Sequence, residues 1–333
     1  MATNPAGTAT TGTSVDRISR RERLYAALQR HGALAVLILI VAVSAFVFDR
    51  FFTYGNLENI VAQGAFLGLI AVGMTFVIIS KGIDLSVGSL LALGGVLAAY
   101  SVKVAWPLAL IVPVLACGAI GLVNGLLIAK GKMAPFIVTL AALLGVRGLV
   151  LAIAGERTIG VSGAPVFTWL GRGEVLGIDV PIFVMVFAFA IGMLVLNRTG
   201  YGQAIFAIGS SEDAAQLMGI PVDRVKIIAY TVSGALAGLA GALLAARLSA
   251  GQPVAGAAWE LDAIAAVVVG GTLLTGGAGS MSGSLVGVLI LGTLQNLINQ
   301  VATLSSYTQQ LLSGAFLIVV VTAQIYLTRN RTY

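Results

Sequence analysis

The chain carries few side chains that could do acid–base or nucleophilic chemistry. Four ionisable residues lie in or beside long apolar runs: Asp84, Arg147, Glu260 and Asp262. Ionisable groups inside a membrane typically mark proton relays or substrate paths, and four scattered positions are too few for a relay. The single histidine, His31, borders an apolar run, so no Ser/His/Asp set is credible, and neither is a paired-carboxylate site. The residues therefore predict no catalytic, cofactor or metal site.

The chain also lacks the common phosphate-binding loop. In G-x-x-x-x-G-K-[ST], the lysine must reach the nucleotide phosphates. The glycine-rich segment 270–284, GGTLLTGGAGSMSGS, contains no lysine and lies between apolar runs. If ATP drives this protein, the ATPase is a separate chain.

Several polar residues in the apolar runs are candidates for a translocation path or a gate. They are Asp84, Ser86, Asn124, Glu260, Asp262 and Asn296. For the acids, which stand near the starts of apolar helices, the alternative is capping or a favourable interaction with the helix dipole. For the amides within the runs, the alternative is hydrogen bonding between helices. Both alternatives stay open from the sequence.

A segment of about thirty residues, Asn197 to Lys226, is too long for a simple connection between spans. It reads NRTGYGQAIFAIGSSEDAAQLMGIPVDRVK and predicts a two-turn helix over 211–218. Ser211 is a good N-cap, and Gly219 stops the helix. A helix this short is not stable alone in water. It must therefore pack on its own membrane domain, on a partner or on the membrane surface.

The composition of this helix favours a partner. Glu212 and Asp213 complement the positive end of the helix dipole. Ala214, Ala215 and Met218 are expected to form a small apolar face suited to a partner groove.

The rest of the chain is typical of a membrane protein. Of its 333 residues, 58% are hydrophobic and 10% are charged, against about 25% charged residues in soluble domains. A span needs roughly 20 apolar residues, which predicts an all-α polytopic protein with about ten transmembrane helices. The expected spans are 33–48, 58–80, 84–102, 106–129, 134–154, 180–197, 225–247, 262–277, 283–301 and 307–327.

The basic residues give the orientation of these spans. Starting inside, 13 of the 19 Lys and Arg residues fall on the cytoplasmic side and 5 on the outer side, with Arg147 within a span. This bias predicts that both termini are cytoplasmic. Because the positive charges are scattered at span ends, the net charge of +6 does not indicate nucleic-acid binding. Residues 1–30 are expected to be a largely disordered cytoplasmic tail, and 31–333 the transmembrane domain.

Two glycine-rich segments, 81–89 and 270–284, break the apolar runs. VGSL at 87–90 matches SGSL at 282–285, and paired broken segments point to a duplicated transporter. On this span count both breaks follow spans that run the same way, whereas an inverted repeat requires opposite directions. A parallel repeat, a chance match and a miscounted span all remain possible. A third segment, 155–180, predicts an outer loop with a short helix or a lid.

Four stretches resemble the permease subunits of bacterial ABC importers for ribose, xylose, galactose and similar monosaccharides. They are GMTFVIISKGIDLSVGSLLAL (73–93), GLVNGLLIAKGKMAPFIVTLAALLGVRGL (121–149), GYGQAIFAIGSSEDAAQLMGIPVDRVK (200–226) and ARLSAGQPVAGAAWELDAIAAVVVGGTLLTGGAGSMSGSLVG (246–287). The resemblance covers most of the chain. It departs at Gly209-Ser210-Ser211, where the family usually has Gly-Gly-Asn, and at Gly271-Thr272-Leu273. These departures make the identity of the sugar unsafe to transfer.

The resemblance implies a multi-pass subunit of the bacterial cell membrane that is not itself an enzyme. It implies three partners: a cytoplasmic ABC ATPase, an extracytoplasmic sugar-binding protein and a second permease copy. The loop 198–224 would hold the coupling helix, with ATPase contacts at Ser211, Glu212, Asp213, Ala214, Ala215, Met218 and Gly219. Two alternatives are an ABC permease for branched-chain amino acids or nucleosides and a stand-alone secondary transporter or channel. A membrane-embedded enzyme is the least favoured.

Overall fold

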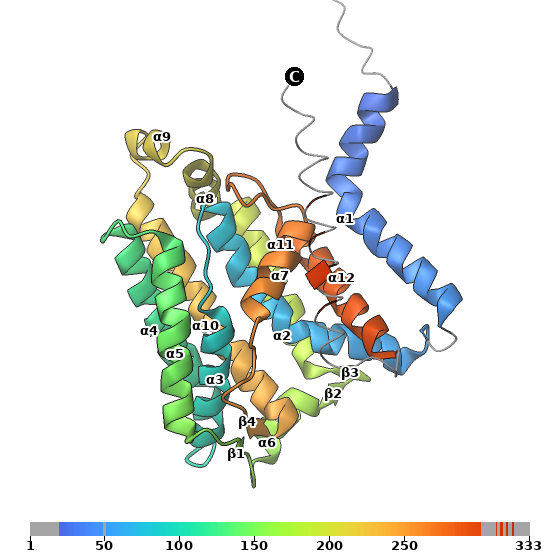
Figure 1. Ribbon diagram of the computed structural model, residues 1–333, viewed down its shortest axis with the longest axis vertical. Helices are drawn as coiled ribbons and strands as arrows, with labels where there is room; N and C mark the ends of the chain where they lie inside the picture. Colours follow the sequence, from blue (N-terminus) through green and yellow to red (C-terminus); the bar gives the residue numbers. More distant parts are fainter. Residues whose placement is uncertain are drawn as a thin grey trace, which may run out of the picture.

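The computed structural model describes residues 20–48 and 51–300, together with five separate positions between 311 and 322. Within these residues the fold is helical, with four very short strands (Figure 1). The helices are α1 (Arg20–Val47), α2 (Tyr54–Ile79), α3 (Val87–Ser101), α4 (Leu108–Ala129), α5 (Pro135–Ala154), α6 (Pro165–Arg172), α7 (Val180–Arg198), α8 (Gly200–Ser210), α9 (Glu212–Leu217), α10 (Val222–Leu248), α11 (Trp259–Val269) and α12 (Met281–Gln300). The strands are β1 (Ile159–Gly160), β2 (Glu174–Val175), β3 (Ile178–Asp179) and β4 (Ala250–Gly251).

Six of these helices are long and apolar enough to cross a membrane, namely α2, α4, α5, α7, α10 and α12. The expected spans 33–48 and 84–102 correspond to shorter apolar helices, Gly32–Val47 and Val87–Ser101. The tenth span, 307–327, lies outside the continuously described residues. A polytopic helical membrane protein is therefore confirmed in outline, while the count of ten and the cytoplasmic termini remain predictions.

The expected bounds of one span are wrong. The predicted span 262–277 is the short helix α11, which begins at Trp259 and ends at Val269. The apolar run continues to Leu274, but Gly271 takes φ +95, a conformation that glycine adopts without the steric cost of a side chain. Helix α1 begins at Arg20, within the segment 1–30 that was predicted as a tail, and the bounds of the tail and the transmembrane domain remain predictions. In the outer loop, the expected short helix is confirmed as α6.

The core contains two sets of three consecutive helices, α2–α3–α4 and α10–α11–α12, that make corresponding contacts. Helix α10 packs on α3 and α4 of the first half, and α2 packs on α11 and α12 of the second. Figure 1 shows that α2 and α10 run in opposite directions, and so do α3 and α11. At the crossing of α2 and α10, a Cβ added to Gly73 would lie 2.7 Å from the Cα of Ser233. The absence of a side chain there lets the two backbones touch.

This arrangement resolves the conflict over the repeat. The VGSL and SGSL strings begin α3 and α12, but α11 occupies the position equivalent to α3. The glycine–serine match therefore joins helices with different contacts, and the contacts and directions of the helices indicate an inverted correspondence.

The two ends of the molecule are held together by different backbone contacts. At the α9 end, the amide of Gly277 donates to the carbonyl of Ile79 at 2.9 Å, which fixes the 270–280 loop on the end of α2. At the β4 end, β1 pairs antiparallel with β4, and β2 with β3. We use the names α9 end and β4 end below.

Candidate functional sites

The short helix predicted over 211–218 is confirmed as α9. The Oγ atom of Ser211 accepts the amide hydrogen of Ala214 at 3.3 Å, as expected of an N-cap. The chain leaves the helix through Gly219 at φ +79. Figure 1 shows α9 at the edge of the molecule, joined to the core by α8 and α10.

The expected outward face of α9 is wrong for one residue. Ala215 is fully buried, so it packs on its own domain and is not available to a partner. Leu217 and Met218 are 90% and 67% exposed and form the apolar tip of the segment. Leu217 was not among the predicted contacts, although an apolar residue beside a predicted helix end in a polar loop is a signal for a docking residue.

Ion pairs fix α9 and its neighbours to the first turns of α10. Lys226 Nζ lies 2.6 Å from Glu212 Oε2, and the Lys226 side chain is only 14% exposed. Lys132, from the α4–α5 connection, pairs with Asp223 at 3.1 Å. Glu212, expected as a partner contact, is thus already engaged within the chain. Tyr201 of α8 donates to the carbonyl of Val225 at 3.2 Å, and burial raises the pKa of its hydroxyl above the ordinary value.

The structure brings three of the predicted path residues together in one buried cluster. Asp84 Oδ1 accepts from the amide of Ser86 at 3.0 Å and from its hydroxyl at 2.6 Å. Asn124 donates to Ser86 Oγ at 3.2 Å. Ser233 of α10 donates to Asp84 Oδ2 at 2.9 Å, a contact that sequence reasoning missed because it spans 149 positions. The capping alternative for Asp84 holds in part, because it accepts an amide at the start of α3.

Glu260 and Asp262 lie in the first turn of α11, where acids favourably oppose the helix dipole. Glu260 is 9% exposed, and its Oε2 has no hydrogen-bond partner. A Cβ on Gly88 would lie 2.2 Å from this oxygen, so the carboxylate rests on the first turn of α3. Arg147 Nη1 donates to the carbonyls of Pro253 and Ala255 at 2.8 Å each.

Asn296 lies in a third, separate cluster. Its Nδ2 donates to Asn56 Oδ1 at 2.9 Å, and Gln300 donates to Asn296 Oδ1 at 2.7 Å. These bonds join α12 to the start of α2, as the interhelical alternative expects. The six predicted residues therefore form three groups and not a single path.

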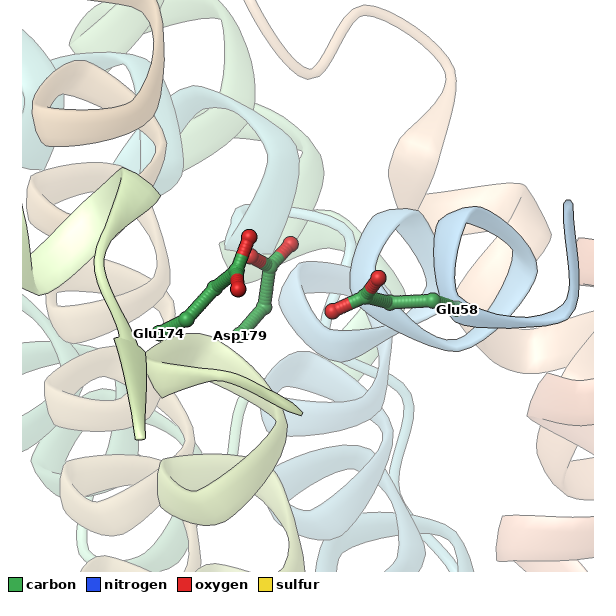
Figure 2. A group of neighbouring side chains, drawn as sticks. All are labelled: Glu58, Glu174 and Asp179. Atoms are coloured by element: carbon green, nitrogen blue, oxygen red, sulfur yellow. The ribbon is translucent and has the colours of Figure 1, made fainter. Parts of the chain in front are cut away.

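A further polar cluster at the β4 end was not expected from the sequence. Figure 2 shows Glu58 of α2 pointing toward Glu174 and Asp179, and one carboxylate oxygen from each lies within 4.8 Å of the others. Asp179 pairs with Arg247, the last-turn cation of α10, at 2.7 Å. With Arg172 and Leu248, this pair lines an open cavity of about 330 Å³. The cluster joins residues from α2, the β2–β3 hairpin and α10.

The six long apolar helices and their backbone-to-backbone packing define a multi-pass helical membrane protein. Residues 56–321 match the family described as the permease component of branched-chain amino acid transport systems. The chain is 45% identical to the ribose import permease protein of Haemophilus influenzae, covering 87% of this chain and 91% of that protein. The corresponding Bacillus subtilis protein is 44% identical, over 88% and 92% of the two chains. The L-arabinose ABC transporter permease protein of Azospirillum brasilense is 35% identical, over 93% and 92%.

No solved structure matches the chain. The chain belongs to this family of transport-system permease components. It is thus a subunit of a membrane transporter and not an enzyme, and it resides in the cell membrane.

Proposed function

We propose that this chain is the permease subunit of an ATP-binding-cassette importer and carries a monosaccharide delivered by an extracytoplasmic binding protein. The observation that carries the proposal is its similarity, over most of its length, to import permeases named for ribose, arabinose and xylose. The few ionisable groups in the core disfavour proton coupling, because proton relays are built from such groups. A separate ATPase chain then supplies the energy.

The energy enters at the α9 end through the loop 198–224. The exposed apolar pair Leu217 and Met218 is the anchor that enters a groove of the ATPase, because a few buried apolar residues dominate most interfaces. The Glu212–Lys226 pair connects α9 to α10, so movement of α9 is passed to the helix that contacts α2, α3 and α4. Coupling requires that two ATPase states bind two permease states with different affinity.

The remaining assignments follow from this orientation. The α9 end faces the cytoplasm, and the β4 end faces the binding protein. Ten spans place both termini in the cytoplasm, with 1–30 as the tail and 31–333 as the permease domain. A second copy of this chain completes the membrane core. Ser211, Asp213, Ala214 and Gly219 border the apolar tip and surround the ATPase contact.

The test reconstitutes the full chain with its ATPase and binding protein in liposomes. Wild type is expected to accumulate labelled ribose, arabinose or xylose only with ATP. The double variant Leu217→Glu/Met218→Glu places charge in the docking groove, and we expect ATPase co-purification to weaken on the order of tenfold or more. Leu176→Glu is the matched control, since Leu176 is 96% exposed at the opposite end. Unchanged co-purification in the double variant contradicts the coupling assignment.

One observation favours a second candidate. The matching family is described for branched-chain amino acid transport. Uptake of labelled leucine by the same liposomes, with no uptake of pentoses, would support that substrate class. Uptake that persists without ATP and without the ATPase would instead indicate a stand-alone transporter.

A further inference from the structure

The inverted halves carry a sequence correspondence at the helices α3 and α11. An acid followed by leucine stands at the start of each helix. Asp84-Leu85 precedes α3, and Glu260-Leu261 lies in the first turn of α11. In each case a glycine pair follows ten residues after the acid, at 94–95 and at 270–271. The helices also occupy equivalent places, α3 against α10 and α11 against α2. Glu260 therefore corresponds to Asp84 in this local sequence pattern, although Asp84 precedes α3 and Glu260 lies in the first turn of α11.

The two carboxylates differ in how they are satisfied. Asp84 is fully buried and accepts three hydrogen bonds, two from Ser86 and one from Ser233. In the second half the position equivalent to Ser86 is Asp262, whose carboxylate has no hydrogen to donate when it is ionised. Glu260 is nine-tenths buried, yet its Oε2 has no partner in the described part of the chain. Buried polar oxygens are rarely left so, and each exception needs a reason.

The surroundings of Glu260 supply a complementary donor and an approach. Arg147 is half-buried, interacts electrostatically with Glu260, and donates two hydrogen bonds to backbone carbonyls through Nη1. A guanidinium has five N–H donors, so donors remain for a ligand. The neighbouring residues Val254 and Leu261 are 63% and 52% exposed, whereas Glu260 Oε2 itself is buried against Gly88, so a ligand reaches it only when α3 and α11 move apart. Carboxylate and guanidinium together can accept from one hydroxyl and donate to another oxygen of the same polyol.

We propose that Glu260 and Arg147 form a hydroxyl-binding station for the transported sugar. Glu260 Oε2 accepts a hydrogen bond from a sugar hydroxyl, replacing the serine hydroxyls that satisfy Asp84 in the other half. Arg147 orients the connector 253–255 and donates to a second sugar oxygen. Asp84 is then a structural residue. This inference rests on the proposed function, because it names the groups by which that sugar path would recognise its cargo.

Trp259, next to Glu260 in the chain, makes a direct binding assay possible. The chain has three tryptophans, and the variant Trp106→Phe/Trp169→Phe leaves Trp259 as the only one. Ribose added to the purified permease is expected to change the Trp259 fluorescence saturably. Glu260→Gln should weaken this binding about tenfold, as loss of a charge-assisted hydrogen bond predicts. Glu156→Gln, an exposed glutamate outside the site, is the control and should leave the binding unchanged.

A panel of monodeoxy riboses keeps the test independent of folding of the variant. In the chain with native Glu260, at least one deoxy sugar should bind at least fivefold more weakly than ribose. The same sugar should lose little in Glu260→Gln, because hydroxyl and acceptor act as a pair. The proposal is overturned if all deoxy sugars bind with the same affinity as ribose. It is also overturned if a deoxy sugar loses the same affinity in Glu260→Gln as in the chain with native Glu260. Uptake distinguishes the failures: if the reconstituted complex imports pentoses but Trp259 does not respond, the station is wrong and the proposed function stands.

Discussion

Substitution of Gly241 tests the close backbone contact between α3 and α10. A Cβ on this residue of α10 would lie 2.0 Å from the carbonyl oxygen of Leu91 and 2.8 Å from the amide nitrogen of Gly95. Ordinary Cβ contacts begin near 3.4 Å, so Gly241→Ala must separate α10 from α3 by more than an ångström. Overpacking of this kind costs about 1–3 kcal/mol.

The matched control is Gly145→Ala in α5, where an added Cβ meets nothing within 4 Å. Both changes gain the same helix propensity, about 1 kcal/mol in soluble helices, so their difference isolates the clash. The assay is thermal unfolding in detergent with a maleimide dye that reacts with Cys117, a buried thiol and the only cysteine of the chain. At roughly 2–4 °C per kcal/mol, Gly241→Ala should melt several degrees below Gly145→Ala. Equal melting temperatures refute the backbone contact between α3 and α10.

Two further predictions concern polar contacts. Lys226→Met should reduce sugar uptake per ATP hydrolysed in the reconstituted complex. It should lower the free energy of unfolding by less than about 1 kcal/mol, because the Glu212–Lys226 pair is partly exposed. The charge reversal Glu212→Lys/Lys226→Glu should restore coupling, and unchanged coupling in Lys226→Met contradicts the proposed transmission from α9 to α10. Ser233→Ala removes one of three hydrogen-bond donors to the buried Asp84, and we expect it to lower the free energy of unfolding by about 1–3 kcal/mol in the same melting assay. Ser282→Ala, at an exposed serine, is the control. Equal shifts of the melting temperature in the two variants contradict the Asp84 cluster.

Local features of this chain could be predicted from the sequence, and long-range contacts could not. The cap of α9 at Ser211 depends on residues within one turn, so its residue types sufficed. The end of α11 was misplaced because apolar residues continue past Val269 and hydropathy alone does not register a change of φ at glycine. Ser233 went unnoticed because a serine among small residues is ordinary until Asp84 is placed against it. For the same reason the sequence could not show that the six polar residues predicted for a path or a gate lie in three separate groups.

The glycine contacts along α10 have a consequence for how the transporter moves. At Gly241 the nearest atoms of α3 are all backbone atoms, and at Gly73 the nearest atom is the Cα of Ser233, with the small Ser233 side chain beside it. Shear motion consists of small sliding of packed helices past one another, and contacts made by backbone and small side chains leave few protruding groups to obstruct such sliding. The two halves are therefore built for shear. We expect outward or inward opening to involve a small displacement of α10 along α2 and α3. The loops at the two ends of α10 would change conformation to allow it.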